Sequence, residues 1–241
     1  MNRKNIPLKD RIIFALDVDS LEEAEKWVEK LASHINFFKV GLQLFFAGWF
    51  PVIKMITERG HKVMCDLKIC DVPETVKSAL RQLRDRNITF ATVIGNVPIV
   101  KAAVEVKDGV KILAVTVLTS IGDEDIKEMG YEGPIQDLVL YRAKRALEVG
   151  CDGIISSGIE APILRDKLGD NFLIVTPGIR PDTGDEIPGD DQIRIITAQN
   201  AIINGADYVV VGRPIRTAIN PLAVVESMQQ EIEKGLSLQF N

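Results

Sequence analysis

The stretch CDLKICDVPETV (65–76) places three charged side chains, Asp66, Lys68 and Asp71, at the end of an apolar run. Chains usually avoid burying charge, because an ion taken out of water loses its hydration. Asp66 and Lys68 are two residues apart, so they share one face if this segment is a strand. A lysine flanked by carboxylates stays protonated where desolvation alone would lower its pKa. The pattern therefore indicates electrostatic or acid–base chemistry.

These residues also have structural interpretations. Asp66 and Lys68 could form a simple ion pair, although a buried pair is a poor source of stability. Asp71 could begin a helix as the N-cap of a capping box, with Glu74 at the third helical position and Pro73 in the first turn. A capping role for Asp71 would not exclude a catalytic one.

Other polar residues lie at or near the ends of apolar runs, and they are Asp17, Lys39, Thr119, Ser120, Arg180, Gly212 and Arg213. Taken singly, each has an ordinary explanation. Asp17 and the Thr119–Ser120 pair could be turn residues. Lys39 could extend its ammonium out of a sheet, and Arg213 could be a solvated arginine.

The apolar runs alternate with longer amphipathic segments along the whole chain. The expected strands are 12–18, 35–42, 61–68, 88–95, 110–118, 151–157, 171–178 and 206–212. The expected helices are about 21–34, 43–59, 72–86, 97–107, helical material up to 149, 159–168, 191–204 and 220–235. Continuous apolar strands are typical of parallel sheets covered on both faces.

Eight such units, with no change of amino-acid composition along the chain, predict an α/β fold. The expected architecture is a (β/α)8 TIM barrel forming a single domain over residues 1–241. A doubly wound open sheet is the alternative, although no GxGxxG follows the first strand. Active sites of (β/α)8 barrels lie at the carboxyl ends of the strands. The polar residues named above are expected there.

The last two units have the features of a phosphate site. Loops after the seventh and eighth strands of this fold often bind phosphate with backbone N–H groups. Gly212 would let the backbone approach a phosphate closely, and Arg213 would add a guanidinium group that can donate two parallel hydrogen bonds. The irregular segment GIRPDTGDEIPGDD (178–191) is either a surface loop or a lid that closes over a ligand phosphate, with Gln192 as a further donor.

Composition limits the class of protein. The 241 residues are 46% hydrophobic and 26% charged, as in soluble globular proteins. No stretch approaches the ~20 uncharged apolar residues of a membrane span, and the N-terminal residues lack the apolar region of a secretory signal. The net charge of −5 argues against a protein that coats nucleic acid. Three cysteines at irregular spacing favour a cytoplasmic location.

The motifs resemble one family. DLKICD matches the DxKxxD pattern of orotidine 5′-phosphate decarboxylases. Over nearly the whole chain, bacterial members have similar blocks in the same order, and here these read ALDV, FKVGLQLF, DLKICDVPETV, AVTVLTS, VTPGIRP, GDDQIRI and GADYVVVGRPI. DxKxxD also occurs in sugar-phosphate enzymes of the same barrel superfamily, whereas VTPGIRP, the following glutamine and VGRPI are more specific.

The resemblance implies decarboxylation of orotidine 5′-monophosphate to uridine 5′-monophosphate and CO2 in pyrimidine biosynthesis, with no metal and no cofactor. By this comparison Lys68 protonates C6 of the pyrimidine and Asp66 lies beside the substrate carboxylate. Lys39 completes the charge network and touches the ribose.

The remaining roles also follow only from the resemblance. The family pattern assigns the ribose hydroxyls to Asp17, the pyrimidine to Thr119 and Ser120, and the phosphate to Arg180, Gln192, Gly212 and Arg213. It implies a homodimer with shared active sites, in which Asp71, with Thr75 nearby, reaches into the partner's site.

Two positions depart from the family pattern. Cys70 stands where many relatives have histidine, and Val93–Asn96 replaces a stretch that is often His-Ala. These changes affect local packing and the dimer surface rather than a named catalytic role. The alternatives are a magnesium-dependent sugar-phosphate decarboxylase or aldolase, or a non-catalytic nucleotide-binding barrel. A metal requirement would favour the first, and the clustered charges argue against the second.

Overall fold

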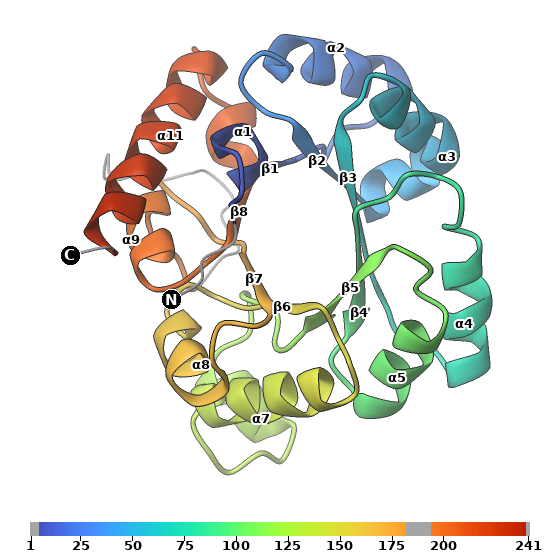
Figure 1. Ribbon diagram of the computed structural model, residues 1–241, viewed down its shortest axis with the longest axis vertical. Coiled ribbons are helices and arrows are strands. Elements are labelled where there is room, and N and C mark those ends of the chain that lie inside the picture. The colour runs from blue at the N-terminus through green and yellow to red at the C-terminus, as the bar shows by residue number, and fades with distance from the viewer. Residues whose placement is uncertain (1–4, 182–193, 240–241) are drawn as a thin grey trace.

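The computed structural model describes residues 5–181 and 194–239. Within them eight parallel strands form a closed barrel (Figure 1). The strands are β1 (Ile12–Ala15), β2 (Phe37–Gly41), β3 (Lys62–Ile69), β4 (Phe90–Ile94), β5 (Lys111–Val115), β6 (Gly153–Ile155), β7 (Leu173–Thr176) and β8 (Tyr208–Val211). Each strand pairs with the next, and β8 pairs with β1. The barrel prediction is confirmed, and the open-sheet alternative is wrong.

Helices surround the barrel (Figure 1). They are α1 (Leu8–Arg11), α2 (Leu21–Leu31), α3 (Leu42–Glu58), α4 (Pro73–Arg81), α5 (Val97–Glu105), α6 (Asp123–Glu128), α7 (Ile135–Glu148), α8 (Ala161–Leu168), α9 (Ala198–Ile203), α10 (Arg213–Arg216) and α11 (Pro221–Leu238). Ser20 is the N-cap of α2, and its side chain accepts a hydrogen bond from the Glu23 N–H at 3.1 Å. None of the described helices is long and apolar enough to cross a membrane.

One expected helix is wrong in part. The sequence predicts a helix over 191–204, but α9 begins at Ala198 with Thr197 as its N-cap. Ile196 instead forms a parallel bridge with Ile179. Tertiary pairing with the chain beyond β7 therefore overrides the local helical pattern. Residues 191–193 lie outside the described residues.

Aromatic side chains occupy the interior at the amino ends of the strands. Phe37, Phe90 and Tyr208 are the first residues of β2, β4 and β8, and their ring centroids lie 5.0 to 5.8 Å apart. This packing matches the layered interior of such barrels. Since apolar groups fill this end of the barrel interior, the interior can open into a polar pocket toward the carboxyl ends.

Candidate active site

A bulge in β3 shapes the segment that carries Asp66 and Lys68. Cys65 pairs with Ala91 of β4, and the next pair is Ile69 with Val93. Residues 66–68 of β3 therefore lie opposite a single residue of β4, Thr92. Lys68 has φ = 49°, in the left-handed region that residues with a Cβ seldom adopt. Bulges of this kind redirect side chains beside active sites.

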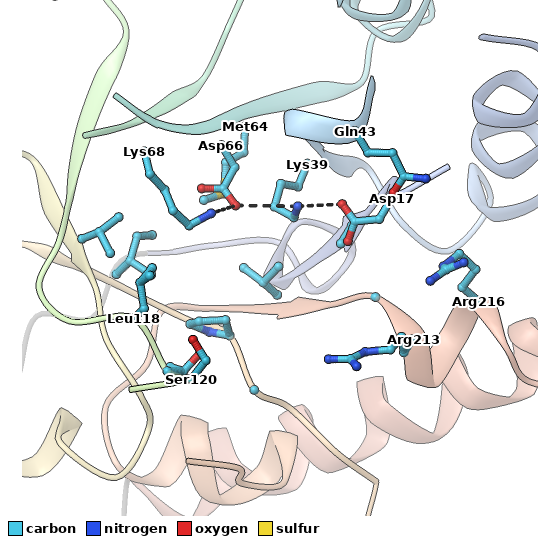
Figure 2. Close-up of a pocket in the computed structure, with 18 of the residues that line it drawn as sticks. Asp17, Lys39, Gln43, Met64, Asp66, Lys68, Leu118, Ser120, Arg213 and Arg216 are labelled. Carbon is cyan, nitrogen blue, oxygen red and sulfur yellow. Dashed lines mark hydrogen bonds and ion pairs between the residues drawn. The ribbon is translucent and has the colours of Figure 1, made fainter. Parts of the chain in front are cut away.

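Four charged side chains form a row at the carboxyl ends of β1, β2 and β3 (Figure 2). The Lys39 ammonium lies 3.0 Å from Asp17 Oδ1 and 3.6 Å from Asp66 Oδ2. The Lys68 ammonium lies 2.9 Å from the same Asp66 oxygen. The order Asp17–Lys39–Asp66–Lys68 alternates in sign, so every charge has an oppositely charged neighbour. We call this set the charge row.

Contacts within the charge row keep Lys39 and Asp66 ionised. Burial by itself raises the pKa of Asp66, but the Lys39 and Lys68 ammonium groups and hydrogen bonds from Lys68 and Thr92 outweigh it and lower that pKa. Burial by itself lowers the pKa of Lys39, and the carboxylates of Asp66 and Asp17 more than reverse this effect. Lys39 and Asp66 are therefore both charged at neutral pH, although both are buried.

A pocket of about 600 Å³ opens over the charge row. Its lining includes most of the residues that the sequence singled out, namely Asp17, Lys39, Asp66, Lys68, Thr119, Ser120, Arg180, Gly212 and Arg213. The pocket thus brings together residues from β1, β2, β3 and the loops after β5, β7 and β8. Its size suits a small-molecule ligand.

The two sides of the pocket differ in charge. Figure 2 shows Arg213 across the pocket from the charge row. Arg180 and Arg216 also line the pocket. A Cβ added at Gly212 would lie 3.2 Å from Ala15 Cβ, so a larger residue would crowd this wall. The arrangement can bind an anionic group at the arginines while a second part of the same ligand meets the charge row.

Two of the predicted site residues that the structure describes are not brought into this pocket. Asp71 and Thr75 are exposed and do not line it. The N-cap of α4 is Val72, whose N–H donates to the Asp71 carboxylate at 2.7 Å, so the interpretation of Asp71 as an N-cap is wrong. Gln192 lies outside the described residues.

Sequence reasoning missed several residues of the site. Thr92 contacts both Asp66 and Lys68, and Gln43 and Arg216 line the pocket. The one sequence signal for Thr92 was a polar residue inside the apolar run FATVI.

A buried ion pair beside the pocket was also missed. The Arg194 guanidinium pairs with Glu160 and donates to the Leu118 carbonyl at 2.8 Å. Leu118 lines the pocket, so this pair supports its wall from outside. Nothing in the local sequence distinguishes Glu160 or Arg194 from a surface residue.

Within residues 5–181 and 194–239, no group of three or more His, Cys, Asp and Glu side chains could hold a metal ion. A closed (β/α)8 barrel with charged side chains converging at the carboxyl ends of its strands is the architecture of a TIM-barrel enzyme. The particular family follows from comparison with known proteins. The Orotidine 5′-phosphate decarboxylase / HUMPS family profile matches residues 10–228, so the chain belongs to this family.

Individual relatives agree with this assignment. The orotidine 5′-phosphate decarboxylase of Methylococcus capsulatus is 46% identical over 233 residues, which is 96% of either chain. The protein of the same name from Xanthomonas axonopodis pv. citri is 42% identical over 241 residues, or 98% of either chain. The crystal structure of orotidine 5′-phosphate decarboxylase from Lactobacillus acidophilus superposes with a TM-score of 0.79 at 36% identity, covering 92% of this chain and 99% of that one.

Proposed function

We propose that this protein decarboxylates orotidine 5′-monophosphate to uridine 5′-monophosphate and CO2, a step of pyrimidine nucleotide synthesis. The observation that carries the proposal is the charge row, with Lys39 and Asp66 buried, facing a cluster of arginines within one pocket. Family membership and the names of full-length relatives supply the substrate. No observation favours the sugar-phosphate or the binding-protein alternative.

The chemistry explains why a lysine is needed. Loss of CO2 leaves an electron pair at C6 of the pyrimidine, where no adjacent carbonyl can accept it as an enolate would. An ammonium held at C6 stabilises this charge as it develops and then donates its proton to the carbon. Lys68 suits this role, because its ammonium is held by Asp66 while its side chain is 35% exposed to the pocket. The amine left behind regains a proton from solvent after product release.

The neighbouring charges prepare the lysine and the substrate. We assign Asp66 to the side of Lys68 that the substrate carboxylate approaches, so that departure of CO2 removes a like charge from its vicinity. Lys39 stabilises Asp66 from the other side at 3.6 Å, which keeps that carboxylate ionised. Because the ion pairs of the charge row hold these groups in place, little reorganisation is needed during the reaction.

The rest of the pocket orients the nucleotide. We assign the ribose hydroxyls to Asp17 with Lys39, and the pyrimidine to Thr119 and Ser120. The phosphate group is assigned to Arg180, Gly212, Arg213 and, outside the described residues, Gln192. Binding energy from the remote phosphate can then be used to align C6 with Lys68, which raises kcat rather than only tightening binding.

The test is loss of the orotate absorbance from orotidine 5′-monophosphate in the presence of a chelator. We expect rapid turnover by the wild-type protein and none by Lys68→Ala. Lys62→Ala is the matched control, since it removes a lysine at the opposite end of β3, where it pairs with Asp10. Turnover only after magnesium is added would favour the sugar-phosphate alternative. Tight nucleotide binding without turnover would favour the binding protein.

We also propose that the protein is a homodimer with shared sites. Leu42, Phe46 and Val72 are large apolar side chains that are 56%, 83% and 64% exposed, so they are available to contact a partner. Leu42 and Phe46 follow β2. Val72 follows the neighbouring strand β3, where it is next to exposed Asp71 and near exposed Thr75 in the sequence. A partner packed on this surface would bury the apolar groups and receive Asp71 in its own pocket.

Two experiments test the dimer. Phe46→Asp should yield monomers in sedimentation or light scattering, because a charge in the interface would remain desolvated and unpaired. Mixing inactive Lys68→Ala with inactive Asp71→Ala should restore up to about a quarter of wild-type activity after subunit exchange, since only hybrid dimers contain an intact site. Demonstrated exchange without recovery would contradict shared sites.

The other expectations are a single folding domain, a cytoplasmic location, and no nucleic-acid or membrane partner. Cys65, Cys70 and Cys151 are free thiols, which suits a reducing compartment. A single calorimetric transition and recovery of the protein in the soluble cell fraction are the expected results. Two separate transitions would contradict the single domain.

A further inference from the structure

Thr92 is a polar residue in an otherwise apolar strand. Thr92 lies between Ala91 and Val93 in β4 and is fully buried, so its hydroxyl requires partners within the protein. The hydroxyl donates to Asp66 Oδ1 at 2.9 Å and accepts from the backbone N–H of Lys68 at 2.9 Å. Since the ionised Asp66 carboxylate can only accept a hydrogen bond, the Thr92 hydroxyl must be the donor between them. Thr92 thus contacts both members of the Asp66–Lys68 pair without lining the pocket.

The bond to Lys68 replaces a missing sheet hydrogen bond. Residues 66–68 have no paired residue in β4 because of the bulge. The backbone N–H of Lys68 would lack its usual strand partner there, and the Thr92 hydroxyl accepts it instead. Lys68 also adopts φ = 49°, a conformation that persists only where the surroundings enforce it. The Thr92 hydroxyl is one such constraint.

The bond to Asp66 determines which carboxylate oxygen faces the lysines. With Oδ1 held by Thr92, Oδ2 receives the Lys68 ammonium at 2.9 Å and the Lys39 ammonium at 3.6 Å. A partial rotation of the carboxylate would move Oδ2 away from at least one of these ammonium groups and lengthen that ion pair. After burial and the two ammonium groups, the Thr92 hydrogen bond is a further influence on the pKa of Asp66, and it acts to lower it.

We propose that Thr92 is a positioning residue for the reaction, acting through Asp66 and Lys68 rather than on the substrate. The inference rests on the proposed decarboxylase function. The Thr92 hydroxyl fixes the bulge at Lys68 and the orientation of the Asp66 carboxylate together, which aims the Lys68 ammonium at the reacting carbon.

The test compares Thr92→Val, which keeps the shape and removes the hydroxyl, with Thr92→Ser, which keeps the hydroxyl. We expect Thr92→Val to lower kcat roughly ten- to hundredfold, the equivalent of one hydrogen bond to a charged group. KM should change little, because Thr92 does not line the pocket. Thr92→Ser should remain within about threefold of wild type, since its hydroxyl can make both hydrogen bonds. The matched control is Thr116→Val, which removes a buried hydroxyl that donates to a neutral group, the Ile155 carbonyl.

The outcomes separate the two proposals. A wild-type protein without turnover contradicts the decarboxylase function itself. A wild-type protein that is active, together with a Thr92→Val variant of undiminished kcat, overturns the role of Thr92 alone. Equal losses of kcat in Thr92→Val and Thr116→Val, or in Thr92→Val and Thr92→Ser, would also overturn it, because they would indicate general packing. If Thr92→Val does not fold, Thr92→Cys, a weaker hydrogen-bonding group, should lose kcat relative to Thr92→Ser, and equality of the two contradicts the proposal.

Discussion

Replacing Asp66 by asparagine would remove the carboxylate that lies between two ammonium groups. At an effective dielectric constant of about 20, attraction to Lys68 at 2.9 Å amounts to ~6 kcal/mol and attraction to Lys39 at 3.6 Å to ~5 kcal/mol. These gross values are largely offset by the desolvation of Asp66, whose side chain is 10% exposed. Removing one partner of a buried ion pair typically destabilises a protein by about 3–5 kcal/mol.

The lower end of this range applies here. Lys68 is 35% exposed and Asp17 42% exposed, so solvent screens part of the network. We therefore expect Asp66→Asn to unfold about 3 kcal/mol more easily than wild type at pH 7. For a chain of this size the loss corresponds to a Tm lower by roughly 6–12 °C. Decarboxylase activity should be lost as well, because the variant no longer holds the Lys68 ammonium in place.

The effect should depend on pH in a defined direction. The folded-state pKa of Asp66 lies below its ordinary value of 3.8. Its contribution to stability is therefore complete above that value and disappears as the pH falls through the lowered folded-state pKa. Wild type and Asp66→Asn should accordingly differ fully at pH 7 and converge in strong acid.

Thermal and denaturant unfolding of both proteins between pH 2 and 8 would measure this difference. Asp108→Asn is the control, since Asp108 pairs with Arg84 at the surface and should contribute less than about 1 kcal/mol. An Asp66→Asn protein as stable as wild type at pH 7 would refute the reasoning. So would a difference that persists unchanged to the lowest pH.

Three further predictions concern the barrel. Glu160→Gln leaves the buried Arg194 charge without its carboxylate partner and should lower the free energy of unfolding in urea by about 3–5 kcal/mol. The control Glu124→Gln, at an exposed ion pair, should lower it by less than about 1 kcal/mol, and equal losses would contradict the burial of the Glu160–Arg194 pair. Gly153→Ala should destabilise the barrel by roughly 1–3 kcal/mol, because a Cβ there would lie 2.5 Å from Leu173 Cβ, and unchanged denaturant midpoints would argue against this packing. Burial raises the pKa of Cys151 to about 11 and also raises the pKa of Cys65, so a thiol reagent at pH 8 should label neither cysteine until the protein is unfolded. Rapid labelling of both thiols in the native protein would disprove their burial.

The barrel was predictable because its pattern is repetitive. Each apolar run followed by an amphipathic segment independently indicates a buried parallel strand and a covering helix, and the eight units agree with one another. The helix expected over 191–204 was wrong at its start, since pairing of Ile196 with Ile179 depends on residues outside any local window. The interpretation of Asp71 as an N-cap was wrong because the chain enters α4 one residue later, at Val72.

The sequence by itself determined which residue types stand at the carboxyl ends of the strands. Asp17, Lys39, Asp66 and Lys68 could be selected because polar groups after apolar runs are conspicuous, and parallel strands in a barrel place their ends on one side. The tertiary structure decided how these groups meet. The bulge opposite Thr92, the oxygen of Asp66 that faces both lysines, and the pairing of Glu160 with Arg194 all depend on contacts between strands and loops distant in the chain. The hydrophobic periodicity of the sequence indicates which face of a strand a residue occupies. The register between strands and the orientation of side chains arise only when the sheet closes into a barrel and the strands must pack together.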